Sequence, residues 1–404
     1  MNKIIFKPCI IGLGYVGLPI LLNLSKRYDA IGYDNNHNRI KKLSKGEDFF
    51  NEFKKKELID KSVKYTNSLE TIKNYNLFIV TVPTPILKNK KPDLKHLKDV
   101  CSNLSKIIKK NDIIIFESTV YPGLTNDYCV PFLQKKNSWK EGLDFFVGYS
   151  PERVNPGDKN HDLNKINKIL AYPYSYLKKD LIKLYSLISK KIVFSENIKE
   201  AEAAKVIENI QRDVNIGLIN EIYLVCKKLK LDFNNVIDLA STKWNFLRFS
   251  PGLVGGHCLP VDPYYLAYIS KKNNFKTKIT LAGRSINDAM AKTIKNEIIY
   301  EIRKNNINEK KKIVICGLSY KKDVADLRNS LSLKIYNDLK KKYKKIKGYD
   351  PLIDSSYKKK YNLINSRNEF LKFDIYILLT NHSIIEKNLK LLPKKKIIIN
   401  LLGN

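Results

Sequence analysis

Short apolar runs alternate with glycine-containing turns at the start of the chain. The apolar run Cys9–Ile11 is followed by a glycine-rich turn and an apolar helical pattern over about residues 18–27, and a second run, Ala30–Tyr33, ends at Asp34. Parallel strands that are covered on both faces are continuous apolar runs. This part of the chain is therefore predicted to begin a doubly wound α/β sheet.

Apolar runs of the same kind continue to about residue 195. Runs at 77–82, 113–116, 145–149 and 191–194 are predicted strands, and a lysine-rich helical region near 36–62 and a helix over 93–109 lie between them. Strands that alternate with helices indicate a parallel sheet. Residues 1–195 are predicted to form an N-terminal Rossmann domain.

The periodicity then becomes that of a long helix. Apolar residues recur every three or four positions from about residue 200 to 229, which predicts a spine between lobes and a dimer surface. Lys205, Asn209 and Arg212 follow at i, i+4 and i+7 and share a face. The alternative for Lys205 is a lysine exposed to solvent. Residues 196–300 are predicted to form a central helical domain.

The C-terminal part repeats the pattern of the first strands. A strand begins near Lys310, a glycine turn and a helix follow, and a strand ending at Asp350 mirrors the one ending at Asp34. Further strands are predicted at 375–379 and 397–400. Residues 301–404 are therefore predicted to be a second Rossmann-like domain. The predicted fold class is α/β, with two doubly wound parallel-sheet domains joined by helices.

The glycine turn of the first domain has the spacing of a dinucleotide-binding motif. Gly12 makes the tight turn, Gly14 lets the backbone approach a pyrophosphate, and Gly17 lets helix and strand pack closely. Tyr15 and Val16, between these glycines, are included in the predicted cofactor site. Asp34 is placed to accept from a ribose 2′-hydroxyl, which favours NAD over NADP. Arg39 is a candidate contact for the adenosine end, or else a solvated helix residue.

Polar residues follow several predicted strands. Ligands of doubly wound sheets bind at the carboxyl ends of the strands. Pro83 and Thr84 after one strand, and Ser118 and Thr119 after the next, are therefore candidate contacts to the cofactor or the reacting carbon. A strand-terminating turn is the alternative for Thr84. Glu152, in the loop after a further strand, is a candidate acid or base.

A loop rich in glycine and proline, residues 249–265, presents a thiol at Cys258. Proline fixes loop dihedrals, and glycine allows a ligand to approach the backbone closely. A thiol on such a platform is a candidate nucleophile. The alternative is a tight surface loop with a small buried cysteine.

Composition narrows the class of protein. The chain has 404 residues, enough for two or three domains, and a formal net charge of +34. The lysines are spread along the chain together with many Asn and Ile, and all three have A/T-rich codons. Codon bias therefore explains the charge better than a nucleic-acid partner does. A diffuse positive field still concentrates a phosphorylated substrate. No nucleic-acid partner and no metal site are predicted.

The cellular context is predicted to be cytoplasmic. No run of eighteen apolar residues is present, so no membrane association is expected, and the N-terminus enters a strand without a signal-peptide pattern. Six cysteines without Cys-x-x-Cys spacing indicate reduced thiols.

Blocks of the chain, taken in order, resemble the UDP-glucose/GDP-mannose dehydrogenase family. They are Gly12–Gly17, Glu117–Thr119, Ser150–Arg153, Lys205 with Asn209, Gly255–Asp262 and Gly317–Ser330. The resemblance implies an N-terminal NAD domain, a central dimerisation domain and a C-terminal nucleotide-sugar domain. It also implies NAD as cofactor, a UDP-sugar as substrate, a homodimer through the central helices, and oxidation of C6 from alcohol to carboxylate with two NAD per turnover.

The resemblance assigns roles to the candidate catalytic residues. Cys258 is expected to trap the aldehyde as a thiohemiacetal, which is oxidised to a thioester and cleaved by water. Lys205 and Asn209 are expected to donate to the oxyanion, and Glu152 to activate the hydrolytic water. Two further members of the expected site are Asp262, which hydrogen-bonds there, and Thr119, near a catalytic water.

Substrate contacts follow from the same resemblance. Lys321 is expected to contact the diphosphate, Arg328 to lie near the cofactor, and the loop Phe249–Gly255 to wrap the sugar nucleotide. The other expected substrate contacts are Glu152, Arg153, Val154, Lys205, Asn209, Arg212, Arg248, Gly252 and His257.

The segments 150–158 and 242–258 resemble the branch that acts on a UDP-N-acetylhexosamine, UDP-GlcNAc or UDP-GalNAc, and whose product feeds surface-polysaccharide synthesis. Val261 stands where many UDP-glucose dehydrogenases have lysine. Relatives often carry arginine at the position of Ser250. Arg248, on the same face of an extended segment, is expected to replace it. The alternatives are a UDP-glucose 6-dehydrogenase, a two-electron hydroxyacid-type dehydrogenase and a non-catalytic binding protein.

Overall fold

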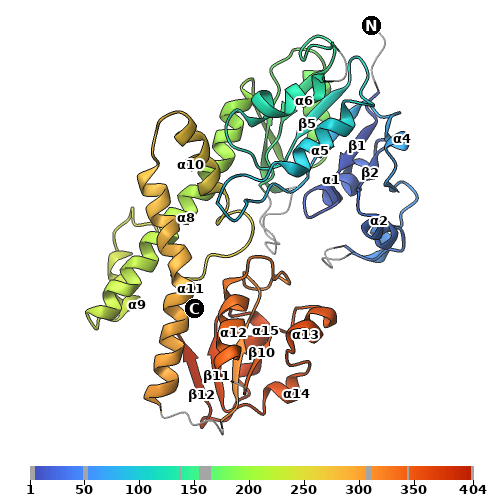
Figure 1. Ribbon diagram of the computed structural model, residues 1–404. Coiled ribbons are helices and arrows are strands. Elements are labelled where there is room, and N and C mark those ends of the chain that lie inside the picture. The colour runs from blue at the N-terminus through green and yellow to red at the C-terminus, as the bar shows by residue number, and fades with distance from the viewer. Residues whose placement is uncertain are drawn as a thin grey trace. The chain divides into compact units, whose positions relative to one another are not determined.

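Two β-sheets, one mostly and one fully parallel, and a set of helices make up the described part of the protein (Figure 1). The computed structural model describes residues 5–48, 53–135, 138–153, 165–305, 311–343 and 345–401. The chain divides into two units, Met1–Glu208 with Tyr264–Asn273, and Asn209–Pro263 with Asn274–Asn404. Each unit contains one of the sheets. Helix α8, Ile198–Lys228, begins in the first unit and continues into the second.

The sheet of the first unit has eight strands in the order β3-β2-β1-β4-β5-β6-β7-β8. All neighbours are parallel except β6 and β7, which are antiparallel. The strands are β1 Pro8–Ile11, β2 Ile31–Tyr33, β3 Lys64–Thr66, β4 Leu77–Val80, β5 Ile113–Phe116, β6 Phe146–Tyr149, β7 Asn167–Ala171 and β8 Lys191–Ser195.

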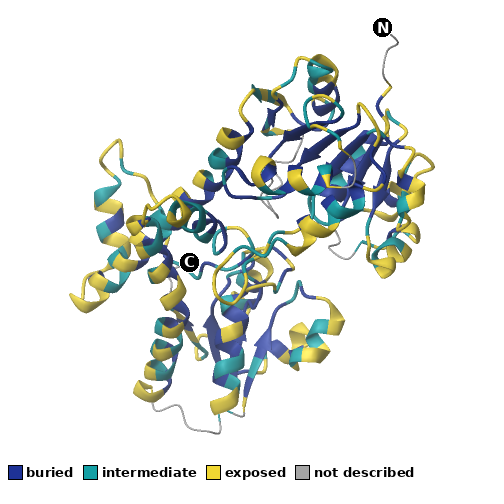
Figure 2. Ribbon diagram, turned by 45° about the horizontal axis from the view of Figure 1, so that its top comes forward, coloured by how far each residue is buried: buried dark blue, intermediate teal, exposed yellow. Residues whose placement is uncertain are grey.

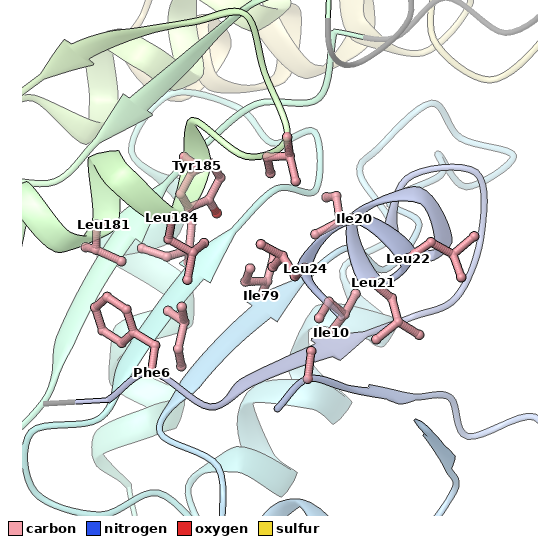
Figure 3. Close-up of a cluster of buried hydrophobic side chains, with 14 of the residues drawn as sticks. Phe6, Ile10, Ile20, Leu21, Leu22, Leu24, Ile79, Leu181, Leu184 and Tyr185 are labelled. Carbon is pink, nitrogen blue, oxygen red and sulfur yellow. The ribbon is translucent and has the colours of Figure 1, made fainter. Parts of the chain in front are cut away.

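Helices pack on this sheet around an apolar core. They are α1 Gly17–Leu24, α2 His37–Ser44, α3 Lys55–Leu58, α4 Leu69–Ile72, α5 Lys95–Leu104, the π-helix η1 Thr125–Cys129, α6 Val130–Gln134 and α7 Lys178–Tyr185. Figure 3 shows the cluster in which α1 contributes Leu21 and Leu24, and α7 contributes Leu181 and Leu184, beside Ile79 of β4. Burial of such side chains stabilises the fold by roughly 2 kcal/mol each.

The second unit combines helices with a smaller, fully parallel sheet in the order β10-β9-β11-β12. Its strands are β9 Ile313–Cys316, β10 Ile346–Tyr349, β11 Ile375–Leu378 and β12 Ile397–Asn400. Its remaining helices are α9 Phe233–Ala240, α11 Lys278–Lys304, α12 Leu331–Lys342, α13 Ser355–Tyr361, α14 Arg367–Phe370 and α15 Ser383–Leu389. Helix α10, Asp262–Lys272, begins here and continues into the first unit. The central strands of both sheets are buried (Figure 2).

The predicted repeat between the two sheets is present in the hydrogen bonds. Gly12 N–H donates to the Tyr33 carbonyl, and Gly317 N–H donates to the Tyr349 carbonyl. Asp34 accepts from the N–H of Leu13, and Asp350 accepts from the N–H of Leu318. The order β2-β1-β4-β5 thus corresponds to β10-β9-β11-β12, and the predicted α/β class with two Rossmann-like sheets is confirmed.

Several elements differ from the sequence prediction. Strands β3 and β7 were not predicted, because β3 is a short edge strand and β7 begins with the polar residues Asn167 and Lys168, which leave only a short apolar run. The lysine-rich region near 36–62, predicted to be helical, contains α2 and α3 among its described residues. Helix α2 ends before Gly46, whose φ of +77° is the left-handed conformation common after a helix. The expected division at residue 300 falls inside α11.

None of the helices that the structure describes is both long and apolar enough to cross a membrane.

We predict that Gly17→Ala destabilises the first unit, whereas Gly14→Ala does not. A Cβ on Gly17 lies 1.9 Å from the Gly12 carbonyl oxygen and 2.5 Å from Thr81 Oγ1, whereas a Cβ on Gly14 has no atom within 4 Å. Overpacking of this kind costs about 1–3 kcal/mol. Thermal unfolding should show a Tm several degrees lower for Gly17→Ala. Equal Tm values for the two variants would contradict this account of α1 packing.

Candidate active site

The glycine turn after β1 is held from both sides. Asp34 Oδ2 accepts from the N–H of Leu13 at 2.9 Å, and Arg39 Nε donates to the Leu13 carbonyl at 2.9 Å. Arg39 also pairs with Asp48, with Nη1 3.2 Å from Oδ1, so it supports the turn and is not a solvated helix residue. Gly12 has a φ of +95°, a conformation that favours glycine.

This turn fits a dinucleotide. Gly14 has open space where a side chain would be, and Tyr15 and Val16 beside it are partly exposed. Helix α1 starts after Val16 without a side-chain cap, which leaves N–H groups directed at a phosphate. A bound NAD would be held by these groups and by Asp34, and it would supply the hydride acceptor.

The hydroxyls after β4 and β5 join the two strand ends. Thr84 Oγ1 donates to the Thr119 carbonyl at 2.6 Å, and Ser118 Oγ donates to the Val82 carbonyl at 2.6 Å. Tyr265 Oη, from α10, donates to the Thr84 carbonyl at 2.9 Å. Pro83, which precedes Thr84 in the loop after β4, is exposed. The hydroxyls of Thr84 and Ser118 therefore hold the loops in place, while Thr119 is partly exposed beside them.

A buried charged cluster lies at the ends of β5 and β6. Lys168 Nζ is 2.7 Å from Glu117 Oε2 and 3.4 Å from Glu152 Oε2, and Tyr185 Oη donates to Glu117 Oε1 at 3.0 Å. Burial raises the pKa of Glu117 to about 7, although the charge of Lys168 opposes this. Burial alone would lower the pKa of Lys168, but attraction by Glu117 and Glu152 outweighs it and raises that pKa.

The other predicted residues of the loop after β6 and of α8 have different environments. Arg153 is paired with Glu208 of α8, with Nη2 2.8 Å from Oε1. Lys205 of α8 is buried, at 8% exposure, so the alternative of a solvated lysine is not what the structure shows. Arg212, further along the helix, is exposed. Val154 lies outside the described residues.

Buried amides of the second unit fix the loop that carries Cys258. Asn220 of α8 accepts from the Gly252 N–H at 2.8 Å and donates to the Gly252 carbonyl at 3.1 Å. Asn220 Nδ2 also contacts Asn287 Oδ1 of α11 at 2.8 Å. Arg284, fully buried on α11, donates to the Leu259 carbonyl at 3.4 Å and pairs with Asp213 at 2.5 Å. The loop is thus attached on both sides of the cysteine.

The end of this loop meets α8 a second time. Asn209 Nδ2 donates to Asp262 Oδ2 at 2.5 Å, and both side chains are buried. Asp262 begins α10, four residues after Cys258. Cys258 is exposed, whereas the other five cysteines are buried. The structure therefore brings the predicted residues Asn209 and Asp262 together and leaves the Cys258 thiol accessible.

The glycines of the loop pack on the turn after β9. A Cβ on Gly255 would lie 2.8 Å from the Asn329 carbonyl oxygen, and Gly256, with a φ of +87°, lies against the ring of Tyr320. Asn329 Nδ2 donates to the Gly256 carbonyl at 3.1 Å. Burial and the nearby Arg328 lower the pKa of His257, while Asp326 opposes this shift. Side chains at these glycines would displace the loop.

The turn after β9 carries Lys321, the expected contact to the diphosphate, and Arg328, which is expected near the cofactor. Lys321 is partly exposed, and Arg328 is held by Asp326 through bonds of 3.1 and 2.7 Å. The buried His382 accepts from the Asp323 N–H at 2.8 Å through Nδ1, and its Nε2 is 3.1 Å from Asp350. This network orders the turn between Leu318 and Asp323.

The expected sugar-selecting segment is the most exposed part of the site. Arg248 pairs with Asp238 of α9, with Nη2 2.6 Å from Oδ1, and both side chains are more than half exposed. Surface pairs of this kind contribute at most about 1 kcal/mol, so this one does not fix Arg248 in place. Phe249 beside it is partly buried, and Ser250 is exposed.

The predicted catalytic residues belong to different units. Cys258, Asn209 and Asp262 belong to one unit, and Thr119, Glu152 and Lys205 to the other. Sequence reasoning missed Lys168, Asn220 and the buried pair of Arg284 with Asp213. A lysine inside an apolar strand was the available signal for Lys168, but lysine is so common here that it did not stand out. Among the described residues, no group of three or more His, Cys, Asp or Glu side chains could hold a metal ion.

Comparison with known proteins gave matches along almost the whole chain. Three models of the UDP-glucose/GDP-mannose dehydrogenase family match, those of the NAD binding domain at residues 6–188, the central domain at 199–289 and the UDP binding domain at 314–402.

Two relatives, named UDP-N-acetyl-D-glucosamine 6-dehydrogenase, come from Salmonella typhi and Pseudomonas aeruginosa. Each is 40% identical, over 93% and 86% of this chain and 90% and 83% of theirs. The solved structure of a UDP-D-ManNAc dehydrogenase from Pyrococcus horikoshii matches with a TM-score of 0.84 and 30% identity, over 98% of this chain and 95% of that one.

We predict that Asn220→Ala loosens the loop around Gly252. The variant removes both hydrogen bonds to this backbone, and hydrogen bonds contribute about 1 kcal/mol each. Hydrogen–deuterium exchange of peptides covering 249–258 should become roughly tenfold faster. Asn215→Ala is the matched control, because Asn215 on the same helix donates only to the Gln211 carbonyl one turn away. Unchanged exchange in Asn220→Ala would show that the loop is fixed by other contacts.

Proposed function

We propose that this chain, which belongs to the UDP-glucose/GDP-mannose dehydrogenase family, oxidises C6 of a UDP-N-acetylhexosamine to the carboxylate. As a member of this family it is an NAD-dependent nucleotide-sugar 6-dehydrogenase. The observation that carries the choice of sugar is the 40% identity, over most of both chains, to relatives named UDP-N-acetyl-D-glucosamine 6-dehydrogenase. UDP-GlcNAc is therefore the substrate to test first.

The proposed chemistry centres on the Cys258 thiol. In the first oxidation a hydride leaves C6 and an aldehyde forms, to which the thiol adds as a thiohemiacetal. Loss of a second hydride gives a thioester, and water then releases the acid and the thiol. The exposure of Cys258, in contrast to the five buried cysteines, supports this assignment. NAD, when bound, accepts the hydride at each oxidation.

The other predicted catalytic side chains have complementary proposed roles. Asn209 and Lys205, one turn apart on α8, donate to the oxyanion of each tetrahedral stage. The bond from Asn209 to Asp262 supports this role, because it fixes the direction of the amide. Glu152 takes the proton of the attacking water, and Thr119 positions that water.

Binding of the substrate is proposed to use both sides of the Cys258 loop. Lys321 binds the diphosphate and Arg328 lies near the cofactor, while the loop Phe249–Gly255 encloses the sugar nucleotide. Gly252 and His257 in and beside that loop, together with Arg153 and Arg212, complete the proposed contacts. Arg248, paired only by an exposed bond to Asp238, remains our candidate to replace the arginine absent at Ser250.

UDP-ManNAc is the second candidate substrate. The 30% identity and the TM-score of 0.84 to the Pyrococcus horikoshii UDP-D-ManNAc dehydrogenase favour it. This identity is lower than that to the UDP-GlcNAc relatives. A two-electron hydroxyacid-type dehydrogenase would have no function for the segment 314–402, which matches the UDP binding domain model.

We also propose a role for each predicted domain and a cellular location for the protein. Residues 1–195 bind NAD, 196–300 form the dimer and carry Cys258, and 301–404 bind the UDP-sugar. All six cysteines are present as thiols and not as disulfides, which supports a reducing compartment, the cytoplasm. A UDP-uronic acid is an activated sugar, which supports its use in surface-polysaccharide synthesis.

The homodimer is proposed to form through α8. Leu218 and Val225 lie on one stripe of this helix and are 52% and 50% exposed, and Leu229, directly after the helix, is 64% exposed. On α9 and the turn after it, Leu239 and Trp244 are 64% and 91% exposed. Clusters of exposed apolar side chains commonly mark protein interfaces, and a second copy of the chain is the proposed partner.

We predict that UDP-GlcNAc gives the highest kcat/KM among UDP-GlcNAc, UDP-GalNAc, UDP-ManNAc and UDP-glucose. Each UDP-GlcNAc consumed should yield two NADH, because oxidation of an alcohol to a carboxylate removes four electrons. Parallel assays of the four sugars, with NADH followed by absorbance, make the measurement. Highest activity on UDP-glucose, or one NADH per sugar, would contradict the proposal.

Cys258→Ser is the control within this assay. The variant should make no acid, because serine cannot supply the thioester, while its Tm stays near that of the wild type. Cys226→Ser, at a buried position, should retain activity and two NADH per sugar. Wild-type rates of acid production by Cys258→Ser would exclude the covalent route.

We predict that the double variant Leu218→Glu, Val225→Glu converts a dimer to a monomer. Four carboxylates in one interface lose hydration and repel one another. Sedimentation velocity should show the dimer for the wild type and for the control Leu391→Glu, an exposed position of the second sheet domain. A wild type that sediments as a monomer at micromolar concentration would refute the proposed dimer.

A further inference from the structure

A lysine is enclosed in the first unit between two carboxylates and a tyrosine. Lys168 lies on β7, Glu117 follows β5, Glu152 follows β6, and Tyr185 ends α7. Their exposed fractions are 1%, 1%, 8% and 0%. Lysine is almost never fully buried unless it is paired. Four titratable groups buried together indicate a role beyond packing.

Every donor of the lysine has an acceptor. An ammonium has three N–H donors. Lys168 Nζ lies 2.7 Å from Glu117 Oε2, 3.3 Å from the Pro151 carbonyl and 3.4 Å from Glu152 Oε2. On the far side, Tyr185 Oη donates to the other oxygen of Glu117 at 3.0 Å. The position of the ammonium is therefore determined from several elements at once.

The carboxylate of Glu152 is fixed through both of its oxygens. Oε2 faces Lys168 at 3.4 Å, and Oε1 accepts from the N–H of Arg153 at 2.7 Å. The Arg153 side chain is occupied elsewhere, in its ion pair with Glu208. Lys168 is thus a cation that faces both Glu152 and Glu117.

We propose that Lys168 is a positioning residue for thioester hydrolysis, and that its ammonium keeps the Glu152 carboxylate ionised and oriented toward the attacking water. Glu117 and Tyr185 hold the ammonium in place. The inference rests on the proposed function, in which Glu152 is the base. In that step water gives a proton to Glu152 and its oxygen to the acyl carbon, and the bond from carbon to Cys258 sulfur breaks to release the thiolate.

Removal of the positive charge has a defined consequence. Without the ammonium, the carboxyl groups of Glu117 and Glu152 share a buried space with no positive charge between them. Two carboxyl groups in such a space do not both ionise, because the two negative charges repel. The pKa of Glu117, already raised by burial to about 7, shows how unfavourable ionisation is there. A proton is then retained on the pair at higher pH, and a protonated Glu152 cannot accept one from water.

The test compares Lys168→Met, Lys168→Arg and the wild type in pH profiles of kcat with UDP-GlcNAc and NAD. In Lys168→Met we expect the acidic limb of the profile to move up by about one pH unit or more, with kcat at pH 7 reduced at least tenfold. KM for NAD should stay within about twofold, because the glycine turn is not altered. Lys168→Arg retains a cation and should keep the acidic limb near that of the wild type.

A second variant protects the test against misfolding. Lys168→Met combined with Glu117→Gln removes the cation and one of the two carboxyls, so the fold should recover and the acidic limb should move back toward the wild-type position. A loss of kcat in Lys168→Met that is equal at every pH, with no shift of the limb, would mean a structural role alone and would overturn the inference.

A measurement without turnover separates this inference from the proposed function. In an infrared titration of the enzyme without substrate, the protonated-carboxyl band of Glu152 is identified by its loss in Glu152→Gln. This band should persist to higher pH in Lys168→Met than in the wild type. An enzyme inactive on every UDP-sugar would refute the proposed function, yet the infrared shift would still support the charge coupling. An active enzyme whose Lys168→Met variant titrates like the wild type would refute the role of Lys168.

Discussion

The double hydrogen bond between Asn220 and the backbone of Gly252 is the contact on which the proposed site most depends. A loop with several glycines has a large conformational entropy to lose, and a nucleophile on it acts only if the loop is already ordered. Asn287 and Arg284 extend this contact, so that the backbone is held before and after Cys258. Asn220, Asn287 and Asp213 are buried, and the hydrogen bonds that link them offset part of the cost of removing these groups from water.

A second constraint is repeated in both sheets. A carboxylate at the end of one strand accepts from the N–H of the neighbouring glycine turn, Asp34 in the first sheet and Asp350 in the second. In the first sheet the other oxygen of Asp34 accepts from the Asn36 N–H. In the second, Asp350 also meets the buried His382. The same carboxylate contact thus supports a turn suited to NAD in the first sheet. In the second sheet it supports a turn whose cations suit a diphosphate.

Much of this arrangement follows from the sequence, and the exceptions have physical reasons. Continuous apolar runs and the glycine spacing predicted both sheets, and the repeat of Gly-Tyr-Asp at 32–34 and 348–350 indicated their equivalence. Strand β7 was missed because it begins with Asn167 and Lys168 and has only a short apolar run after them. A lysine among so many gives no sign that two carboxylates will surround it. Asn220 was missed as well, because its partner is a backbone group 32 residues away. Contacts of this kind depend on the packing of α8 and α11, which periodicity predicts only as helices.

The covalent role of Cys258 is tested most directly by trapping the acyl enzyme. The Glu152→Gln variant is mixed with UDP-GlcNAc and NAD, quenched in acid, and digested for peptide mass mapping. We expect about one uronyl adduct per subunit on the peptide containing Cys258, and two NADH for each adduct, because oxidation is complete and hydrolysis is blocked. Formation of two NADH and free UDP-uronic acid with no adduct on Cys258 would contradict the account.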